Sequence, residues 1–128
     1  MKLKQTRLVT EDVPRLTRFY EAVTGASRAP GGPTYVEFQT PCAGLAIVSS
    51  GVRDAYGLDT VAAAANRSAI LDFEVEDVDR EYNRLRGIVS DWVLPPANQS
   101  WGTRAILFRD PDGNLINCFA PIRVATPV

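Results

Sequence analysis

An internal repeat constrains the fold of this chain more than any other feature of its sequence. The tripeptide Glu-Asp-Val at residues 11–13 recurs at residues 76–78, and each copy follows a strand-like run and opens a helical pattern. Arg15 and Arg80 occupy matching positions after the two copies. Short acidic turns before helices are common, but the apolar patterns on both sides agree as well, which argues against chance. The repeat predicts one supersecondary unit built twice.

The first copy reads as a strand, a helix and a hairpin. Residues 3–9 favour a strand, and apolar side chains recur at helical spacing from Val13 to Val23 before Gly25 ends the helix. Residues 28–33 are a loop by composition, and residues 34–39 and 45–49 form two strand-like runs. Residues 51–67 are predicted to be a linker, in which 61–65 could form a short helix.

The second copy repeats this order. Residues 70–75 predict a strand, and Val78, Tyr82 and Leu85 mark one face of a helix that ends near Gly87. Further strands are expected at 89–94, stopped by two prolines, at 101–109 and at 115–120, with a tail from Pro121 onward. The result is an α+β chain of two tandem βαβββ modules, at about 3–50 and 69–120, within one domain spanning 1–128.

Composition excludes several functional classes. The net charge is −1 and the basic residues are scattered, so no nucleic-acid surface is expected. No apolar run is long enough to span a membrane, and the N-terminus lacks a signal-peptide pattern, so we expect a cytoplasmic protein. The chain has no histidine, which removes the commonest general base and transition-metal ligand. Cys42 and Cys118 do not make a disulfide framework, and Cys118 is expected to be buried.

Three motifs in a fixed order carry a family resemblance. Thr10-Glu11-Asp12-Val13 precedes Phe19-Tyr20, residues 73–78 repeat the strand-to-helix motif, and Trp101-Gly102 leads into residues 108–116. From Leu3 to Phe119 the chain resembles the vicinal oxygen chelate superfamily, which includes glyoxalase I, extradiol dioxygenases, fosfomycin-resistance enzymes and bleomycin-binding proteins. The resemblance implies an open, cup-like mixed sheet around a cavity, with the helices on the outer face.

The resemblance also identifies where a metal would bind. Metal-dependent members carry a ligand, usually histidine, on the first strand of each module and a glutamate on the last strand. By position these ligands fall on Gln5, Ile70 and Asn117, and the strand at 45–49, which could supply a fourth, has no carboxylate. Two neutral amides and an aliphatic side chain cannot offset the dehydration of a divalent metal. We therefore expect neither a metal nor another cofactor.

Strand alternation predicts which side chains face the cavity. If Gln5 points inward, Arg7 does too, and in the second module Ile70, Asp72 and Glu74 share the inner side. Arg7 and Asp72 are equivalent positions of opposite charge. They could form a partly buried pair that orients a polar ligand, or both could be solvated at an open rim.

Aromatic side chains complete the predicted ligand surface. Trp101 follows a loop and is the preferred ligand contact, whereas Phe38 is expected in the core. Asp110 and Asp112 are explained by a turn, and no serine has a partnering base, so no catalytic residue is predicted. The predicted ligand-binding residues are Gln5, Arg7, Tyr35, Asp72, Trp92, Trp101 and Asn117.

These inferences favour a metal-free, bleomycin-resistance-like protein that sequesters a small molecule. The ligand would be an amphipathic antibiotic or aromatic metabolite, and the protein would be a homodimer, as such relatives commonly are. One alternative is an enzyme of the same superfamily: a metal-dependent lyase, isomerase or dioxygenase, or a metal-independent relative using Asp72, Glu74 or Glu37 as general base. Another is a degenerate module that serves only dimerisation or regulation.

Overall fold

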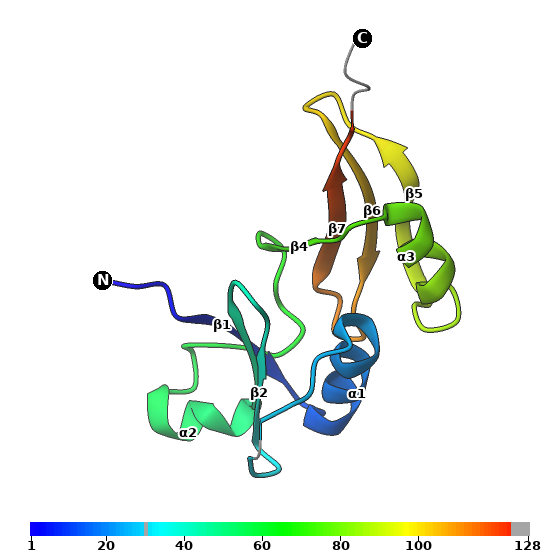
Figure 1. Cartoon of the computed structure of the whole chain (residues 1–128). Helices are drawn as coiled ribbons and strands as arrows, with labels where there is room; N and C mark the ends of the chain where they lie inside the picture. The colour runs from blue at the N-terminus through cyan, green and yellow to red at the C-terminus, as the bar shows by residue number, and fades with distance from the viewer. Residues whose placement is uncertain (30, 124–128) are drawn as a thin grey trace, which may run out of the picture. The chain divides into compact units, whose positions relative to one another are not determined.

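The computed structural model describes residues 1–29 and 31–123 and divides the chain into two compact units (Figure 1). Unit 1 comprises residues 1–66 with 111–113, and unit 2 comprises 67–110 with the residues from 114 onward. The boundary near residue 66 coincides with the end of the predicted linker. The α+β fold class is confirmed: each unit contains one mixed sheet and at least one helix.

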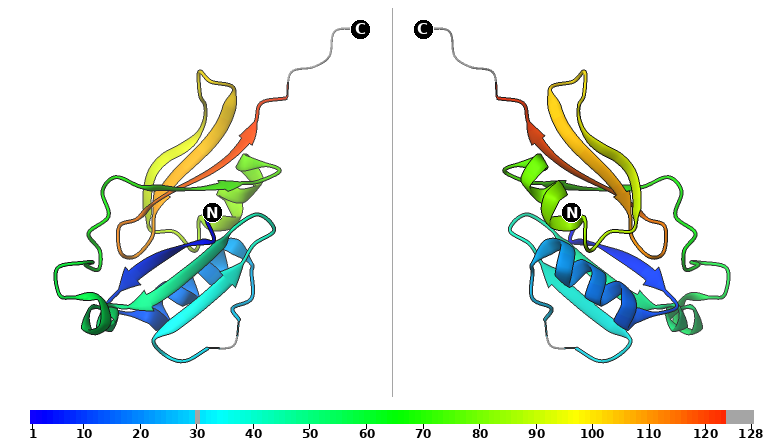
Figure 2. Two further views of the ribbon diagram at one scale, coloured as in Figure 1. Left: turned by 90° about the vertical axis from the view of Figure 1, so that its left-hand side faces the viewer. Right: turned by 90° about the vertical axis from the view of Figure 1, so that its right-hand side faces the viewer.

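Unit 1 is built on a three-stranded sheet in the order β1-β3-β2. Strand β1 (Gln5–Thr10) runs parallel to β3 (Gly44–Ser49), and β2 (Tyr35–Gln39) runs antiparallel to β3. Helix α1 (Val13–Thr24) lies across one face of this sheet (Figure 2). The opposite face is left open by α1.

Helix α1 begins and ends where the sequence predicts. The Asp12 side chain accepts a hydrogen bond from the Arg15 backbone N–H at 3.1 Å and caps the helix. Gly25 ends it in the left-handed conformation, with φ of 68°, which glycine adopts without strain. Leu16 and Tyr20 are fully buried, and such burial contributes about 1.5–3 kcal/mol for each large apolar side chain. Phe38 is also fully buried, so its predicted core position is confirmed.

The first module has three strands where the repeat predicts four. Among the described residues of the segment before β2, one bridge is formed, from Arg28 to Phe38, and a hydrogen bond from the Ala29 N–H to the Glu37 carbonyl at 2.9 Å supports it. Residues 30–33 read Pro-Gly-Gly-Pro. Proline cannot donate to a ladder and glycine weakens a strand, so this composition disfavours a fourth strand here. Pro30 itself lies outside the described residues.

The predicted linker contains helical structure at its start. A 3₁₀ turn, η1 (Ser50–Val52), leads into the short helix α2 (Arg53–Tyr56). The possible helix at 61–65 is not formed, and Ala64 has φ of 54°, which is incompatible with a right-handed helix. Helical structure therefore follows directly after β3, at the start of the predicted linker.

Unit 2 repeats the same topology with a complete four-stranded sheet, in the order β4-β7-β6-β5. Its outer strand β4 (Ile70–Glu74) is parallel to β7 (Leu115–Pro121), as β1 is to β3. Asp77 caps α3 (Val78–Leu85) by accepting from the Arg80 N–H at 3.1 Å, which reproduces the capping of α1 by Asp12. The internal repeat is therefore present in the structure. The predicted tail starts too early, because β7 includes Pro121; residues 124–128 lie outside the described part.

The predicted end of the strand at Leu94 is wrong. Strand β5 (Asp91–Asn98) continues through Pro95 and Pro96 and pairs with β6 (Thr103–Arg109). The pairing shifts register between Trp92 and Leu94 and again between Leu94 and Ala97. Because β5 is an edge strand with these irregularities, its prolines need no ladder hydrogen bond on both sides.

The core of unit 2 lies between α3 and one face of the sheet. Ile106, Phe108 and Ile116 are fully buried there, and Cys118 is buried as predicted. Among the described residues, no helix combines the length and the apolar character needed to cross a membrane.

Candidate functional site

The open face of unit 1 gathers three of the predicted ligand residues. Leu8 and Thr10 of β1 are buried on the α1 side, so the alternate residues Gln5 and Arg7 lie on the opposite side. Arg7 pairs in register with Ala46, and Ala46 pairs with Glu37. Residues paired in this way project from the same face. Tyr35, two positions from Glu37, lies on this face too.

Gln5, Tyr35 and Glu37 form a hydrogen-bonded chain across this face. Gln5 Nε2 donates to the Tyr35 hydroxyl at 2.9 Å, and that hydroxyl donates to Glu37 Oε1 at 2.7 Å. The bond to the Glu37 carboxylate raises the pKa of Tyr35, and the bond from Gln5 opposes part of that rise. Tyr35 therefore remains a protonated hydroxyl that holds an amide and a carboxylate together.

Arg7 finds its partner on α2. Its Nη1 donates to the Tyr56 hydroxyl at 3.1 Å, and its guanidinium carbon lies 5.4 Å from the centre of the Tyr56 ring. The hydrogen bond to Tyr56 raises the pKa of Arg7. Sequence reasoning missed Tyr56, because nothing in the residues 51–67 marks a tyrosine as the neighbour of a strand 49 positions earlier.

The open face of unit 2 combines a polar pair with an apolar strip. Asn117 of β7 pairs in register with Asp72 of β4, and its Nδ2 donates to Asp72 Oδ1 at 3.0 Å. The same row continues through Leu107 of β6 to Leu94 of β5. The rows on either side carry further apolar side chains: Ile70, Leu115 and Phe119. Leu94 was missed because its face depends on the register shifts of β5, whereas Leu107 follows from the regular pairing of β6 with β7.

The two predicted tryptophans lie elsewhere. Trp92 is on the α3 side of the sheet, where its ring packs edge-to-face against Tyr82 and Phe108 at centroid distances of 4.8 and 5.3 Å. This contact gives Trp92 a packing role and supplies no argument for ligand contact. Trp101 lies in the connection between β5 and β6 and is 75% exposed, so its contact with a ligand stays a prediction.

The acidic turn after β6 has the structural role that its sequence predicts. Asp110 is buried and accepts hydrogen bonds from the backbone N–H and the side-chain Nδ2 of Asn114, at 3.0 and 2.8 Å. Asp112 forms an ion pair of 2.9 Å with Arg15. These carboxylates are committed to holding the turn.

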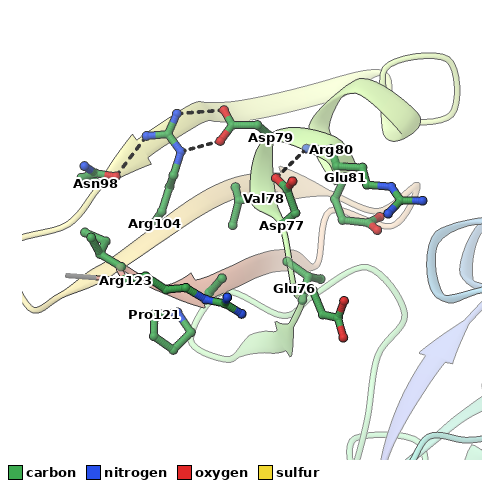
Figure 3. Close-up of a pocket in the computed structure, with 13 residues that line it drawn as sticks. Glu76, Asp77, Val78, Asp79, Arg80, Glu81, Asn98, Arg104, Pro121 and Arg123 are labelled. Atoms are coloured by element: carbon green, nitrogen blue, oxygen red, sulfur yellow. Dashed lines mark hydrogen bonds and ion pairs between the residues drawn. The ribbon is translucent and has the colours of Figure 1, made fainter. Parts of the chain in front are cut away.

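A separate hollow of about 890 Å³ lies on unit 2, beside the start of α3 (Figure 3). None of the predicted ligand residues line it. Arg104 clasps Asp79 through two hydrogen bonds of 2.8 and 2.9 Å and also reaches Asn98, while Asp77 caps the helix. Because none of the predicted ligand residues lies here and its Arg104 and Asp79 are paired with each other, the two sheet faces remain the better candidates for a ligand surface.

The positions at which the family resemblance places metal ligands do not fit a divalent transition metal. Gln5 and Asn117 are neutral amides whose NH₂ groups are bonded to Tyr35 and Asp72, and Ile70 offers no donor atom. Within residues 1–29 and 31–123, no three side chains of His, Cys, Asp or Glu are grouped closely enough to hold a metal ion. Such metals prefer imidazole and anionic donors.

Known proteins share both the sequence pattern and the fold. A Bacillus subtilis protein described as "Uncharacterized protein YraH" is 29% identical, over 93% of this chain and 98% of its own length. A crystal structure of a glyoxalase/bleomycin resistance protein/dioxygenase from Nocardioides is 25% identical with a TM-score of 0.81, covering all of this chain and 88% of that one. A family enzyme of the same description from Burkholderia phytofirmans PsJN, 15% identical, shares the fold with a TM-score of 0.86 over 95% of this chain and 100% of its own.

The sequence pattern of one family spans almost the whole chain. Its model matches residues 2–118, which include both copies of the repeat and all of the predicted ligand residues. This confirms the resemblance drawn from the ordered motifs. The chain belongs to the Glyoxalase/Bleomycin resistance protein/Dioxygenase superfamily.

Proposed function

We propose that this protein binds an amphipathic, aromatic small molecule without a metal and acts by sequestering it. The observation that carries the proposal is the state of the inherited ligand positions: Gln5 and Asn117 are neutral amides tied to Tyr35 and Asp72. Asn117 lies beside apolar side chains on the sheet face opposite α3. Apolar walls with a few fixed polar groups are typical of small-molecule sites.

Sequestration is supported over catalysis by the hydrogen bonds that two of the three candidate general bases already make. Asp72 and Glu37, two of the possible general bases, already accept hydrogen bonds from neighbouring side chains. Burial raises the pKa of Cys118 to about 12, so this thiol is not a nucleophile near neutral pH. The groups on the open faces are thus suited to binding.

The test is a thermal-shift and calorimetry panel on metal-free protein with bleomycin, mitomycin C and menadione. At a concentration about 100-fold above Kd, a ligand of the folded state stabilises it by about 2.7 kcal/mol. We expect stabilisation by at least one compound, and its loss in Asn117→Leu. The matched control is Asn83→Leu, which replaces an exposed amide on α3. No shift with any compound, or binding only after metal is added, would contradict the proposal.

We also propose that the protein is a homodimer. Unit 2 exposes the large apolar side chains of Ile70, Val93 and Trp101, which are 53%, 47% and 75% exposed. Exposed apolar groups are commonly covered by a partner. Sedimentation equilibrium should give twice the chain mass at micromolar concentration, and a monomer there would refute the assignment.

A further inference from the structure

We propose that the sheet of each unit holds one fixed hydrogen-bond acceptor, Gln5 Oε1 in unit 1 and Asn117 Oδ1 in unit 2, and that a small molecule bound at either face supplies the N–H or O–H donor that this acceptor lacks. The inference rests on the proposed function and specifies the chemistry of the ligand. Glu37 and Asp72 are the positioning residues, because they determine which way each amide faces.

In unit 1 the direction of the hydrogen-bonded chain follows from its carboxylate end. The Tyr35 hydroxyl has one proton, and it donates that proton to Glu37 Oε1. Tyr35 can then only accept from Gln5, which must turn its NH₂ group toward the ring. The Gln5 oxygen is left over, without a partner among the residues that the structure describes.

Gly44 keeps space beside this oxygen. Gln5 and Gly44 are register partners, and a Cβ at position 44 would lie 3.1 Å from Gln5 Cβ and 3.6 Å from Gln5 Oε1. The shorter distance is tighter than ordinary packing contacts, so any larger residue would crowd the Gln5 side chain. The glycine therefore leaves the amide oxygen accessible from the β3 side.

In unit 2 a single hydrogen bond fixes the orientation of the amide, where unit 1 uses two. Asp72 Oδ1 accepts from Asn117 Nδ2 at 3.0 Å, which fixes the amide with its oxygen pointing away from the carboxylate. Asn117 Oδ1 is buried and has no hydrogen-bond partner in the described part of the chain. A buried acceptor without a partner is destabilising, and native proteins rarely leave one unless a ligand or water supplies the donor.

Two acceptors oriented by carboxylates discriminate between ligands by their donors. A heteroaromatic ligand with a ring N–H satisfies such an oxygen, whereas a ring of the same shape without the proton leaves it unpaired. Sites built to bond a ligand N–H or O–H reject analogues that lack it much more strongly than apolar pockets reject a change in size.

The experiment compares indole with benzofuran, which has the same shape but no donor, by NMR titration of the full-length protein. We expect indole to bind about tenfold more tightly, the ratio that a single satisfied hydrogen bond gives. Gln5→Leu should lower this ratio toward one for binding at unit 1, Asn117→Leu should do so for binding at unit 2, and Asn83→Leu should leave both ratios unchanged. Glu37→Gln should also lower it, because a glutamine can donate to Tyr35 and let the Gln5 amide turn over. Glu37→Asp, which keeps the carboxylate, should restore part of the ratio.

The possible outcomes separate the two proposals. Equal affinity for indole and benzofuran would overturn the donor inference and leave small-molecule binding intact. Failure of both compounds to bind would count against the small-molecule function and the donor inference with it. In the free protein, nuclear Overhauser contacts from the Gln5 Nε2 protons to the Tyr35 ring are expected, and their absence would refute the orientation in unit 1.

Discussion

Asn117 and Asp72 face each other on the neighbouring parallel strands β7 and β4, joined by a 3.0 Å hydrogen bond. Family members that use a metal carry glutamate at the position of Asn117. Here an uncharged amide stands there, and the nearby carboxylate of Asp72 holds it by its NH₂ group. This position therefore offers a neutral amide within a polar pair rather than an anionic oxygen for a cation.

Removal of metal should leave the protein unaffected. Neutral amides cannot replace the hydration shell of a divalent cation, so Zn²⁺, Mn²⁺ and Ni²⁺ should bind well below one equivalent per chain. The melting temperature should be the same with and without EDTA. Elemental analysis after dialysis checks the first expectation, and a near-stoichiometric metal would contradict it.

The Thr17→Val substitution should stabilise the protein. Thr17 is buried in α1, and its hydroxyl oxygen has no partner among the described residues. Replacing an unsatisfied hydroxyl by a methyl group of similar size should raise the free energy of unfolding by about 1 kcal/mol, measured in urea. Thr10→Val is the matched control: that buried hydroxyl accepts from the Asp12 N–H at 3.1 Å, so its loss should destabilise. If both substitutions lowered the free energy of unfolding equally, the unsatisfied hydroxyl of Thr17 would not be destabilising.

The two helix caps should contribute similarly to stability. Asp12→Ala and Asp77→Ala each remove a side chain that accepts from the N–H three residues later. Each substitution should lower the free energy of unfolding by about 1 kcal/mol. Glu11→Ala is the control, because Glu11 precedes the cap and makes no capping bond. A loss in Glu11→Ala as large as in Asp12→Ala would show that charge, rather than capping, is responsible.

The two cysteines should differ in reactivity. Cys42 is exposed, whereas Cys118 is buried with its pKa raised to about 12 from 9.0 by desolvation. At pH 8 a disulfide reagent such as DTNB should modify one thiol of the folded protein and two in denaturant. Because the pKa is higher in the folded state, the stability that Cys118 contributes is complete below pH 9 and is lost as pH rises toward 12. In Cys118→Ala the free energy of unfolding should fall less steeply between pH 9 and pH 12.

Local chemistry made much of the fold predictable. Asp12 and Gly25 bound α1 because capping and left-handed backbone are properties of those residue types alone. Pro95 and Pro96 led to a wrong end for β5. Proline interrupts a central strand but is tolerated in an edge strand, and only the sheet topology shows that β5 is at the edge. The family resemblance singled out Gln5 and Asn117, whose role stays a prediction, but their hydrogen bonds to Tyr35 and Asp72 depend on how the strands pair. Tyr56 could not be predicted, since its contact with Arg7 is made by a helix that no periodicity indicates.

The single bridge between Arg28 and Phe38 has a consequence for the dynamics of unit 1. Strand β2 has a full ladder on one side and one bridge on the other, so local opening of β2 breaks fewer hydrogen bonds than opening of a strand paired on both sides. Its amide protons should therefore exchange with solvent sooner. The second half of the chain keeps a fourth strand on the equivalent edge. Although the two halves share a topology, their sheets should open locally at different rates. Amide exchange should be faster in the half that contains Tyr35 and Glu37.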